Sequence, residues 1–200
     1  ENGWSIDDSK QILFIRKNNI SEQEIPVYYE DLLGLLDKHF RFKSEEDRIL
    51  HAVSLVTRLI SDIPHPIEVI HGEKGASKTT TMRMNRSLID PSLRDVISIP
   101  KAIQDLAITI SNNYMPCFDN LDTISSEKSD LFCIASTGGG YSKRRLYSDD
   151  DELIVKFKSR ITLNGTNVMA TKSDLLDRCI VLTLERISED ERKEERVVWD

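Results

Sequence analysis

Short apolar runs alternate with amphipathic segments along most of this chain. Runs typical of buried strands lie at 67–70, 96–99, 114–118, 160–163 and 179–184. The segments between them show helical periodicity or helix-capping residues. Because strands that alternate with helices form parallel sheets, the pattern predicts an α/β fold. We expect a five-stranded parallel sheet with helices on both faces.

The predicted helices lie at 28–40, 45–60, 78–89, 101–112, 126–136 and 188–198. The best-marked helix begins after Ser44, has an acidic first turn and ends before Pro64. Its apolar residues recur at the spacing of one helix face. They predict a buried face made of Ile49, Ala52, Val53, Val56, Leu59 and Ile60.

The first 43 residues differ from the rest. Strand-like pieces at 4–6 and 12–16, followed by the helix at 28–40, indicate a small N-terminal β/helical appendage. Residues 44–200 are long enough for one core. Because the chain begins at Glu1 without a methionine, we expect it to be a piece of a longer protein.

Composition narrows the class of protein. The 39% hydrophobic and 30% charged residues are ordinary for a globular domain, and no apolar run approaches a membrane span. Three separated cysteines form neither a zinc pattern nor a disulfide framework, so we expect buried thiols in a cytoplasmic protein. The net charge of −7 argues against a broadly basic nucleic-acid surface but permits a local one.

A glycine-rich loop at 72–79 lies between the strand at 67–70 and the helix that follows, which is the context of a phosphate-binding loop. Lys78 would reach the β- and γ-phosphates of ATP, and Thr79 would bind Mg²⁺. Ser77 stands where most such loops have glycine. The alternative is a helix N-terminus that merely contains glycine and lysine. The predicted nucleotide-binding residues are Gly72, Glu73, Lys74, Gly75, Ala76, Ser77, Lys78, Thr79 and Thr80.

Polar residues end two of the later strands. Asp119 ends the apolar run 114–118 and is predicted to hold Mg²⁺ with Thr79, unless it is only a turn residue. The next residue, Asn120, can orient a water but cannot accept its proton. Hydrolysis is therefore slow, or another carboxylate such as Asp122 acts as the base. Asn164 ends the run 160–163 and could position the attacking water, although Asn-Gly is also an ordinary turn signal.

Two further basic features are ambiguous. Arg178 could act on the nucleotide of a neighbouring subunit, or it could pair with Asp174 or Asp177. Residues 141–158 read as a β-hairpin inserted before the fourth strand. Its cations suit a nucleic-acid backbone, although they could instead pair with the hairpin's own aspartates. The predicted DNA-binding residues are Lys143, Arg144, Arg145 and Lys156.

These motifs occur in a fixed order. The glycine-rich loop is followed by Phe118-Asp119-Asn120-Leu121-Asp122, by Gly138-Gly139-Gly140 before the hairpin, by Leu163-Asn164-Gly165, and by Asp174-Leu175-Leu176-Asp177-Arg178. Gly3-Trp4 and Phe14-Ile15-Arg16 precede them. The set resembles the AAA+ helicase-type ATPases of phages and mobile elements, which are related to minichromosome-maintenance (MCM) and superfamily III helicases. Loops without the last glycine also occur in MCM proteins.

The resemblance implies a hexameric ring with ATP sites between subunits and a hairpin that faces DNA in the central pore. It gives Lys78 the role of phosphate lysine, Thr79 and Asp119 those of magnesium ligands, Asn164 that of sensor and Arg178 that of arginine finger. Asn120 departs from the acidic pair usual in this group.

The function we expect is an ATPase motor domain of a replicative helicase-like protein from a phage or mobile element, with ATP and Mg²⁺ as cofactors. The alternative is a nucleotide-dependent switch or assembly module that hydrolyses ATP weakly and contacts no DNA. A small-molecule kinase is disfavoured because no acceptor pocket or lid is recognisable in the sequence.

Overall fold

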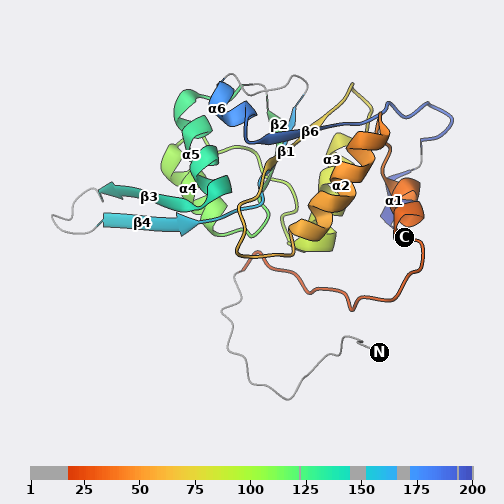
Figure 1. Cartoon of the computed structure of the whole chain (residues 1–200), viewed down its shortest axis with the longest axis horizontal. Coiled ribbons are helices and arrows are strands. Elements are labelled where there is room, and N and C mark those ends of the chain that lie inside the picture. The colour runs from red at the N-terminus through yellow and green to blue at the C-terminus, as the bar shows by residue number, and fades with distance from the viewer. Residues whose placement is uncertain (1–17, 122, 145–151, 166–171, 193, 200) are drawn as a thin grey trace, which may run out of the picture.

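The computed structural model describes residues 18–121, 123–144, 152–165, 172–192 and 194–199. The predicted strand pieces at 4–6 and 12–16 lie outside these residues. Within the described part, four parallel strands form the main sheet and a separate antiparallel hairpin projects from it (Figure 1).

The main sheet has the strand order β2-β5-β1-β6. Its strands are β1 Ile67–His71, β2 Cys117–Leu121, β5 Thr162–Gly165 and β6 Cys179–Thr183. Every neighbouring pair is parallel, and Val69 of the central strand β1 pairs with Leu163 on one side and Val181 on the other. The predicted α/β fold with a parallel sheet is confirmed.

The prediction of a fifth strand at 96–99 is wrong for the described structure. This segment makes a single parallel bridge, Ile97 to Phe118, beside the edge strand β2. The bridge consists of two hydrogen bonds, from the Ile97 N–H to the Cys117 carbonyl at 2.9 Å and from the Asp119 N–H to the Ile97 carbonyl at 3.1 Å.

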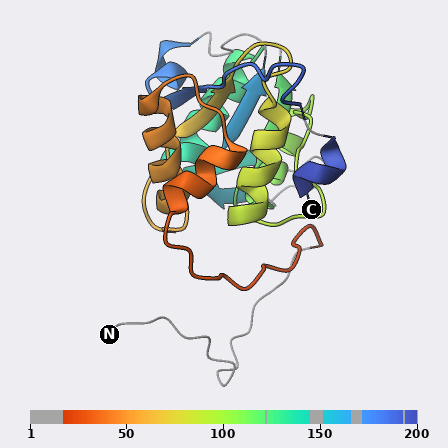
Figure 2. The ribbon, with the colours of Figure 1, turned by 90° about the vertical axis from the view of Figure 1, so that its right-hand side faces the viewer.

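The helices are α1 Leu32–His39, α2 Glu45–Thr57, α3 Lys78–Ile89, α4 Ile103–Ser111, α5 Ser126–Thr137, α6 Ser173–Leu176 and α7 Glu195–Trp199. On one face of the sheet Ile70 packs with Met82 of α3, and on the other Val69 packs with Leu106 of α4 and Phe132 of α5. Figure 2 shows α1, α2 and α3 together on the first of these faces. Helices on both faces are therefore confirmed.

Two predicted helices begin too early. The first starts at Leu32 rather than residue 28, because Asp31 caps it by accepting from the Gly34 N–H at 2.9 Å. The last does not start at Ser188. There the chain makes a turn, in which the Ser188 hydroxyl donates to Glu191 at 2.8 Å, and helix α7 begins only at Glu195.

The predicted buried face of α2 is wrong. Val53 is 54% exposed and Leu59, just beyond the helix, is 64% exposed, and the other large apolar residues of that face are exposed as well. The residues that α2 turns inward are His51, Ser54 and Leu55. The sheet beneath presents buried polar side chains, so α2 must supply polar partners there. That requirement overrides the apolar periodicity.

Two of the three cysteines, Cys117 and Cys133, are buried, as predicted, and the third, Cys179, is only half-buried. None of them forms a disulfide. Burial raises the pKa of Cys117 and of Cys179 to about 11, so both remain thiols near neutral pH.

The predicted hairpin is confirmed in its two arms. Strand β3, Gly139–Arg144, pairs antiparallel with β4, Glu152–Phe157. Val155 and Phe157 are buried against the core below α4, which anchors the base of the hairpin. The far end projects from the body (Figure 1). The Asp-rich turn at 145–151 lies outside the described residues.

Candidate active site

The glycine-rich loop links β1 to α3 through backbone conformations that favour glycine. Gly72 and Gly75 have φ of +155° and +89°. A Cβ on Gly72 would lie 3.1 Å from the carbonyl oxygen of Leu184, so this position also requires the absence of a side chain. The loop is therefore closely packed against the residue that follows β6.

Ser77 stands where most phosphate-binding loops have glycine, and its backbone adopts a conformation that is unusual for serine. It is the N-cap of α3 and adopts a left-handed conformation, with φ 55° and ψ 31°, and its side chain makes no capping hydrogen bond. A non-glycine residue in this region costs roughly 1–2 kcal/mol. The backbone thus takes the shape that glycine favours, despite the serine.

Lys78 folds back over the loop. Its Nζ donates to the carbonyl oxygens of Gly72 at 2.7 Å and Glu73 at 2.9 Å. These partners are neutral carbonyls on the loop itself, so the ammonium charge has no carboxylate partner in the described structure. Of the other predicted loop residues, Ala76 is buried, Thr80 is half-buried and Lys74 is exposed.

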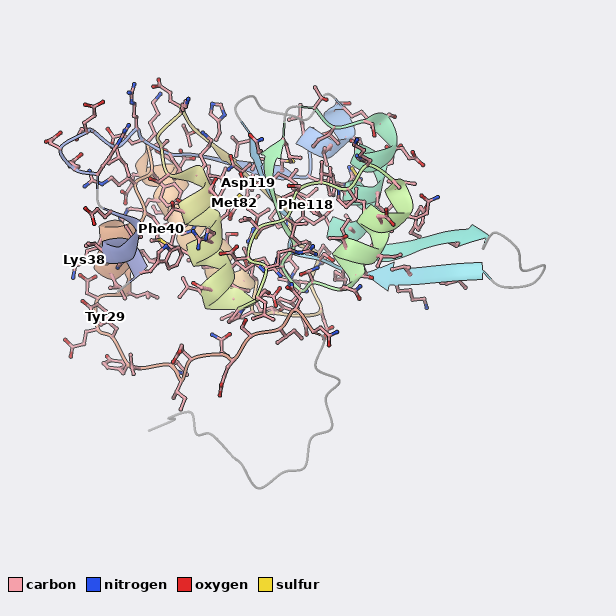
Figure 3. All side chains as sticks on the ribbon, turned by 180° about the vertical axis from the view of Figure 1, so that it is seen from behind. Tyr29, Lys38, Phe40, Met82, Phe118 and Asp119 are labelled. Carbon is pink, nitrogen blue, oxygen red and sulfur yellow. The ribbon has the colours of Figure 1, made fainter. Side chains whose placement is uncertain are left out.

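Thr79, Asp119 and Asn164 come together at the carboxyl ends of the strands. The Thr79 hydroxyl donates to Asp119 Oδ2 at 2.9 Å, and the Asn164 amide donates to Asp119 Oδ1. The Asn164 Nδ2 also lies 3.5 Å from Thr79 Oγ1. Asp119 lies on β2 next to the buried Phe118 (Figure 3). The structure thus brings together side chains from three separate motifs.

Asn164 retains unused bonding capacity. Its side chain is only 3% exposed, yet Oδ1 has no hydrogen-bond partner among the described residues. Buried polar atoms without partners are rare and point to a missing ligand or water. The unpaired atom belongs to a side chain that also contacts both Thr79 and Asp119.

Asn120 occupies a constrained position. Its φ is +56°, its N–H donates to Asp119 Oδ1 at 2.7 Å, and it is exposed. Asn is among the few non-glycine residues that adopt this left-handed region readily. The backbone thus accounts for asparagine at this place. Asp122, the alternative carboxylate, lies outside the described residues.

Arg178 does not join this group. It lies just before β6, next to Cys179, which pairs with Ile67 at the start of β1, whereas the glycine-rich loop follows the other end of β1. Its Nη1 donates to Asp174, both to the carboxylate and, at 2.6 Å, to the carbonyl oxygen. The hydrogen bond from Arg178 holds the pKa of Asp174 below its usual value. The intrasubunit ion pair is the arrangement seen.

The predicted DNA-binding residues are spread over the hairpin. Lys143 and Arg144 stand on β3 opposite Leu153 and Glu152, and Lys156 is exposed on β4. Arg145 lies outside the described residues. Lys158, just past β4, instead donates to the Asp62 carbonyl at 3.0 Å.

One residue that lies beside the glycine-rich loop was not predicted from the sequence. Arg192 lies over Gly75, and a Cβ built on that glycine would be 2.8 Å from the Arg192 guanidinium. Arg186 also approaches the loop, 3.9 Å from Glu73. Arg192 belongs to the segment 188–198 that was expected to be a helix, and Arg186 lies just before it. A helical pattern gives no reason to place an arginine on a distant loop.

A family model described as actinomycete integrative conjugative element replication protein matches residues 31–200. The chain belongs to this family. It is thus a replication protein of a mobile element. No curated protein matches it.

Solved structures of two other proteins resemble this chain. An A-form apo structure of the NrS-1 C-terminal region has a TM-score of 0.56 at 11% identity, covering 90% of this chain and 43% of that one. A second apo structure of the same region has a TM-score of 0.53, again at 11% identity, covering 90% and 44%. A JCV helicase structure scores 0.43 at 12% identity, covering 70% and 41%. At these identities the NrS-1 likeness shows the fold alone, and the chain spans less than half of each matched structure.

Within the described part of this replication protein, no helix is long and apolar enough to cross a membrane.

Proposed function

We propose that this replication protein is an ATP-binding and ATP-hydrolysing motor domain of helicase type, which uses Mg²⁺ and acts on DNA. The observation that carries the proposal is the meeting of Thr79, Asp119 and Asn164 beside the glycine-rich loop. A strand, such a loop, and a helix that begins with Lys-Thr form a phosphate-binding arrangement.

The residues present fit a magnesium–nucleotide ligand. Mg²⁺ needs only one or two protein oxygens when phosphates and water supply the rest, so Thr79 and Asp119 suffice. Lys78 can exchange loop carbonyls for phosphate oxygens by a side-chain rotation. The unpaired Asn164 Oδ1 is available to a water at the same place. When bound, Mg²⁺ would neutralise charge on the phosphates.

The same residues suggest the division of labour in hydrolysis. Lys78 would bind phosphate oxygens, and Asn164 would orient the attacking water. Asn120 cannot accept the proton from that water, because an amide is not a base near neutral pH. We therefore expect slow hydrolysis by the isolated chain and faster hydrolysis in the presence of DNA.

We further propose that the working form is a ring of subunits and that the hairpin contacts DNA. Replacement of Arg178 tests the first of these proposals. The resemblance to ring helicases supports both statements, and the projecting hairpin suits a contact outside the body. The competing proposal, a nucleotide-dependent switch without DNA contact, is favoured by the net charge of −7 and by Asn120.

DNA-stimulated ATP hydrolysis decides between motor and switch. We expect DNA to raise the ATPase rate of the wild-type protein, and Lys78→Ala to lose roughly 100-fold in rate with or without DNA. A triple Lys143/Arg144/Arg145→Ala variant should keep basal activity, lose the stimulation, and bind DNA with a shallower salt dependence. Lys101→Ala, an exposed cation elsewhere, is the control. Turnover that DNA leaves unchanged in the wild type would favour the switch.

A further inference from the structure

The segment that follows β6, residues 184–192, forms a strap beside the glycine-rich loop. The Leu184 N–H donates to the His71 carbonyl at 2.8 Å, and Gly72 packs against Leu184. On its other side Leu184 forms a bridge with Phe42. The start of the strap is thus held between the loop and the segment that precedes α2.

The far end of the strap is also held. Glu191 pairs with Arg41 at 2.8 Å and accepts from the Ser188 hydroxyl at 2.8 Å, and these contacts lower the pKa of Glu191. Beyond the strap, Trp199 of α7 lies under the guanidinium of Arg83 on α3, 4.8 Å from the ring centre. Figure 2 shows the chain passing over the top of the molecule to reach α7 beside α3.

These anchors leave Arg192 directly over Gly75. Two other arginines pair with carboxylates, the exposed Arg41 with Glu191 and the half-buried Arg48 with Glu45, whereas the exposed Arg94, which lies away from the loop, has no ion pair within the described part of the chain. Arg192 makes no ion pair or side-chain hydrogen bond within the described part of the chain. The Arg192 guanidinium and the Lys78 ammonium thus lie at the same loop, and neither has a carboxylate partner within the described residues. Negative charge is favoured at such a place.

We propose that Arg192 is a phosphate-binding residue, supplied by the strap of its own subunit to the nucleoside triphosphate held by the glycine-rich loop. This proposal rests on the proposed function. The planar guanidinium offers two parallel donors to phosphate oxygens, which lysine cannot match. Arg41 and Glu191 are positioning residues, because they fix the strap without facing the loop.

Equilibrium binding of a fluorescent, non-hydrolysable ATP analogue with Mg²⁺ tests the role of Arg192. We expect Arg192→Ala to weaken binding by about tenfold, the size of one lost charge-assisted hydrogen bond. Arg192→Lys should recover part of this loss. Arg94→Ala, an exposed arginine away from the loop, should bind like wild type. Thermal unfolding of each variant checks that the fold is intact.

Replacing Arg41 of the Arg41–Glu191 pair gives a second test. Its expected result differs from that of a general loss of stability. Arg41→Ala should weaken binding by less than Arg192→Ala, and it should have no further effect once Arg192 is removed. Removing an exposed ion pair costs the fold little. Additive losses would mean that Arg41 acts independently of Arg192, which contradicts the positioning role.

The outcomes separate the two proposals. If the wild type binds the analogue, Lys78→Ala does not, and Arg192→Ala binds as well as or better than the wild type, the Arg192 proposal is wrong and the nucleotide site stands. If the wild type itself fails to bind, the proposed function is wrong and the role of Arg192 falls with it.

Discussion

Two groups of polar side chains on the same elements have opposite characters. The candidate site uses Thr79 on α3 and Asn164 on β5. A buried polar cluster, made of Ser54, Arg58, Glu68, Asn85 and Thr162, uses the same helix and strand at positions nearer the amino ends of the strands. Thr162 and Asn164 stand two residues apart on one face of β5.

The buried cluster is closed. Both oxygens of the fully buried Glu68 are occupied, by Ser54 at 3.1 Å and Asn85 at 3.2 Å, and Arg58 pairs with it at 3.3 Å. Arg58 also donates to Thr162 at 2.9 Å. Arg58 Nη2 makes no hydrogen bond within the described residues, but it lies against the Glu68 carboxylate, so the two opposite charges remain paired. These contacts join α2 and α3 to the sheet, and a buried ion pair of this kind is tolerated because its partners stay together.

The candidate site is open. Asp119 and Thr79 reach the rim of the sheet. Among the described residues, Lys78 bonds to loop carbonyls alone and Asn164 keeps an oxygen without a partner. Burial and polarity alone therefore do not identify a functional group of residues here. The useful difference is the position in the fold, because the candidate site lies at the carboxyl ends of the strands, where ligands bind in open α/β sheets.

The largest expected effect is that of replacing Arg178. Its ion pair with Asp174 is formed, as in the buried cluster, but it is partly open to solvent, as in the candidate site. If Arg178 serves a neighbouring subunit, Arg178→Ala should lower turnover by about 1000-fold while ATP binding changes little. Mixing this variant with Lys78→Ala should restore part of the rate, because one mixed interface carries an intact site. If mixed oligomers are shown to form and no activity is recovered, Arg178 does not act on a neighbouring subunit and its ion pair with Asp174 is structural.

A matched pair of carboxylate-to-amide changes tests the comparison itself. Glu68→Gln should lower the free energy of unfolding by about 3 kcal/mol, because Arg58 is left buried without its counter-charge. Asp119→Asn should leave stability nearly unchanged but reduce Mg²⁺-dependent turnover by roughly 100-fold. Urea unfolding and ATPase rates measure the two effects. Equal stability losses in both variants would remove the distinction between closed and open groups.

The smallest effect concerns His51, which joins the closed cluster through Asn85 at 2.9 Å. Burial lowers the pKa of His51, so the folded protein disfavours the charged imidazole. The stabilisation is full above the unfolded pKa of about 6.5 and declines as pH falls toward the folded value. Between pH 7.5 and 5.5, His51→Gln should lose less stability than the wild type, as measured by urea unfolding. His65, whose pKa burial also lowers, is present in both proteins.

Much of the candidate site could be predicted from the chain because its parts are local. The glycine-rich loop, Asp119 and Asn164 each lie at or next to the carboxyl end of a strand, and parallel strands bring those ends to one edge. Ser77 and Asn120 were recognised as departures, but their left-handed backbones were not foreseeable. The reason for each residue became visible only with its φ angle.

The alternation of strands and helices, the hairpin arms and the order of the strand-end residues were predictable from the amino-acid sequence, because these features depend on neighbours along the chain. Tertiary structure decided which face of α2 is buried, since Glu68 and Thr162 are polar partners supplied by distant strands. It also decided that 96–99 makes one bridge and that Arg192 lies over Gly75. Such outcomes depend on contacts between segments far apart in sequence, where satisfying a buried charge outweighs local periodicity.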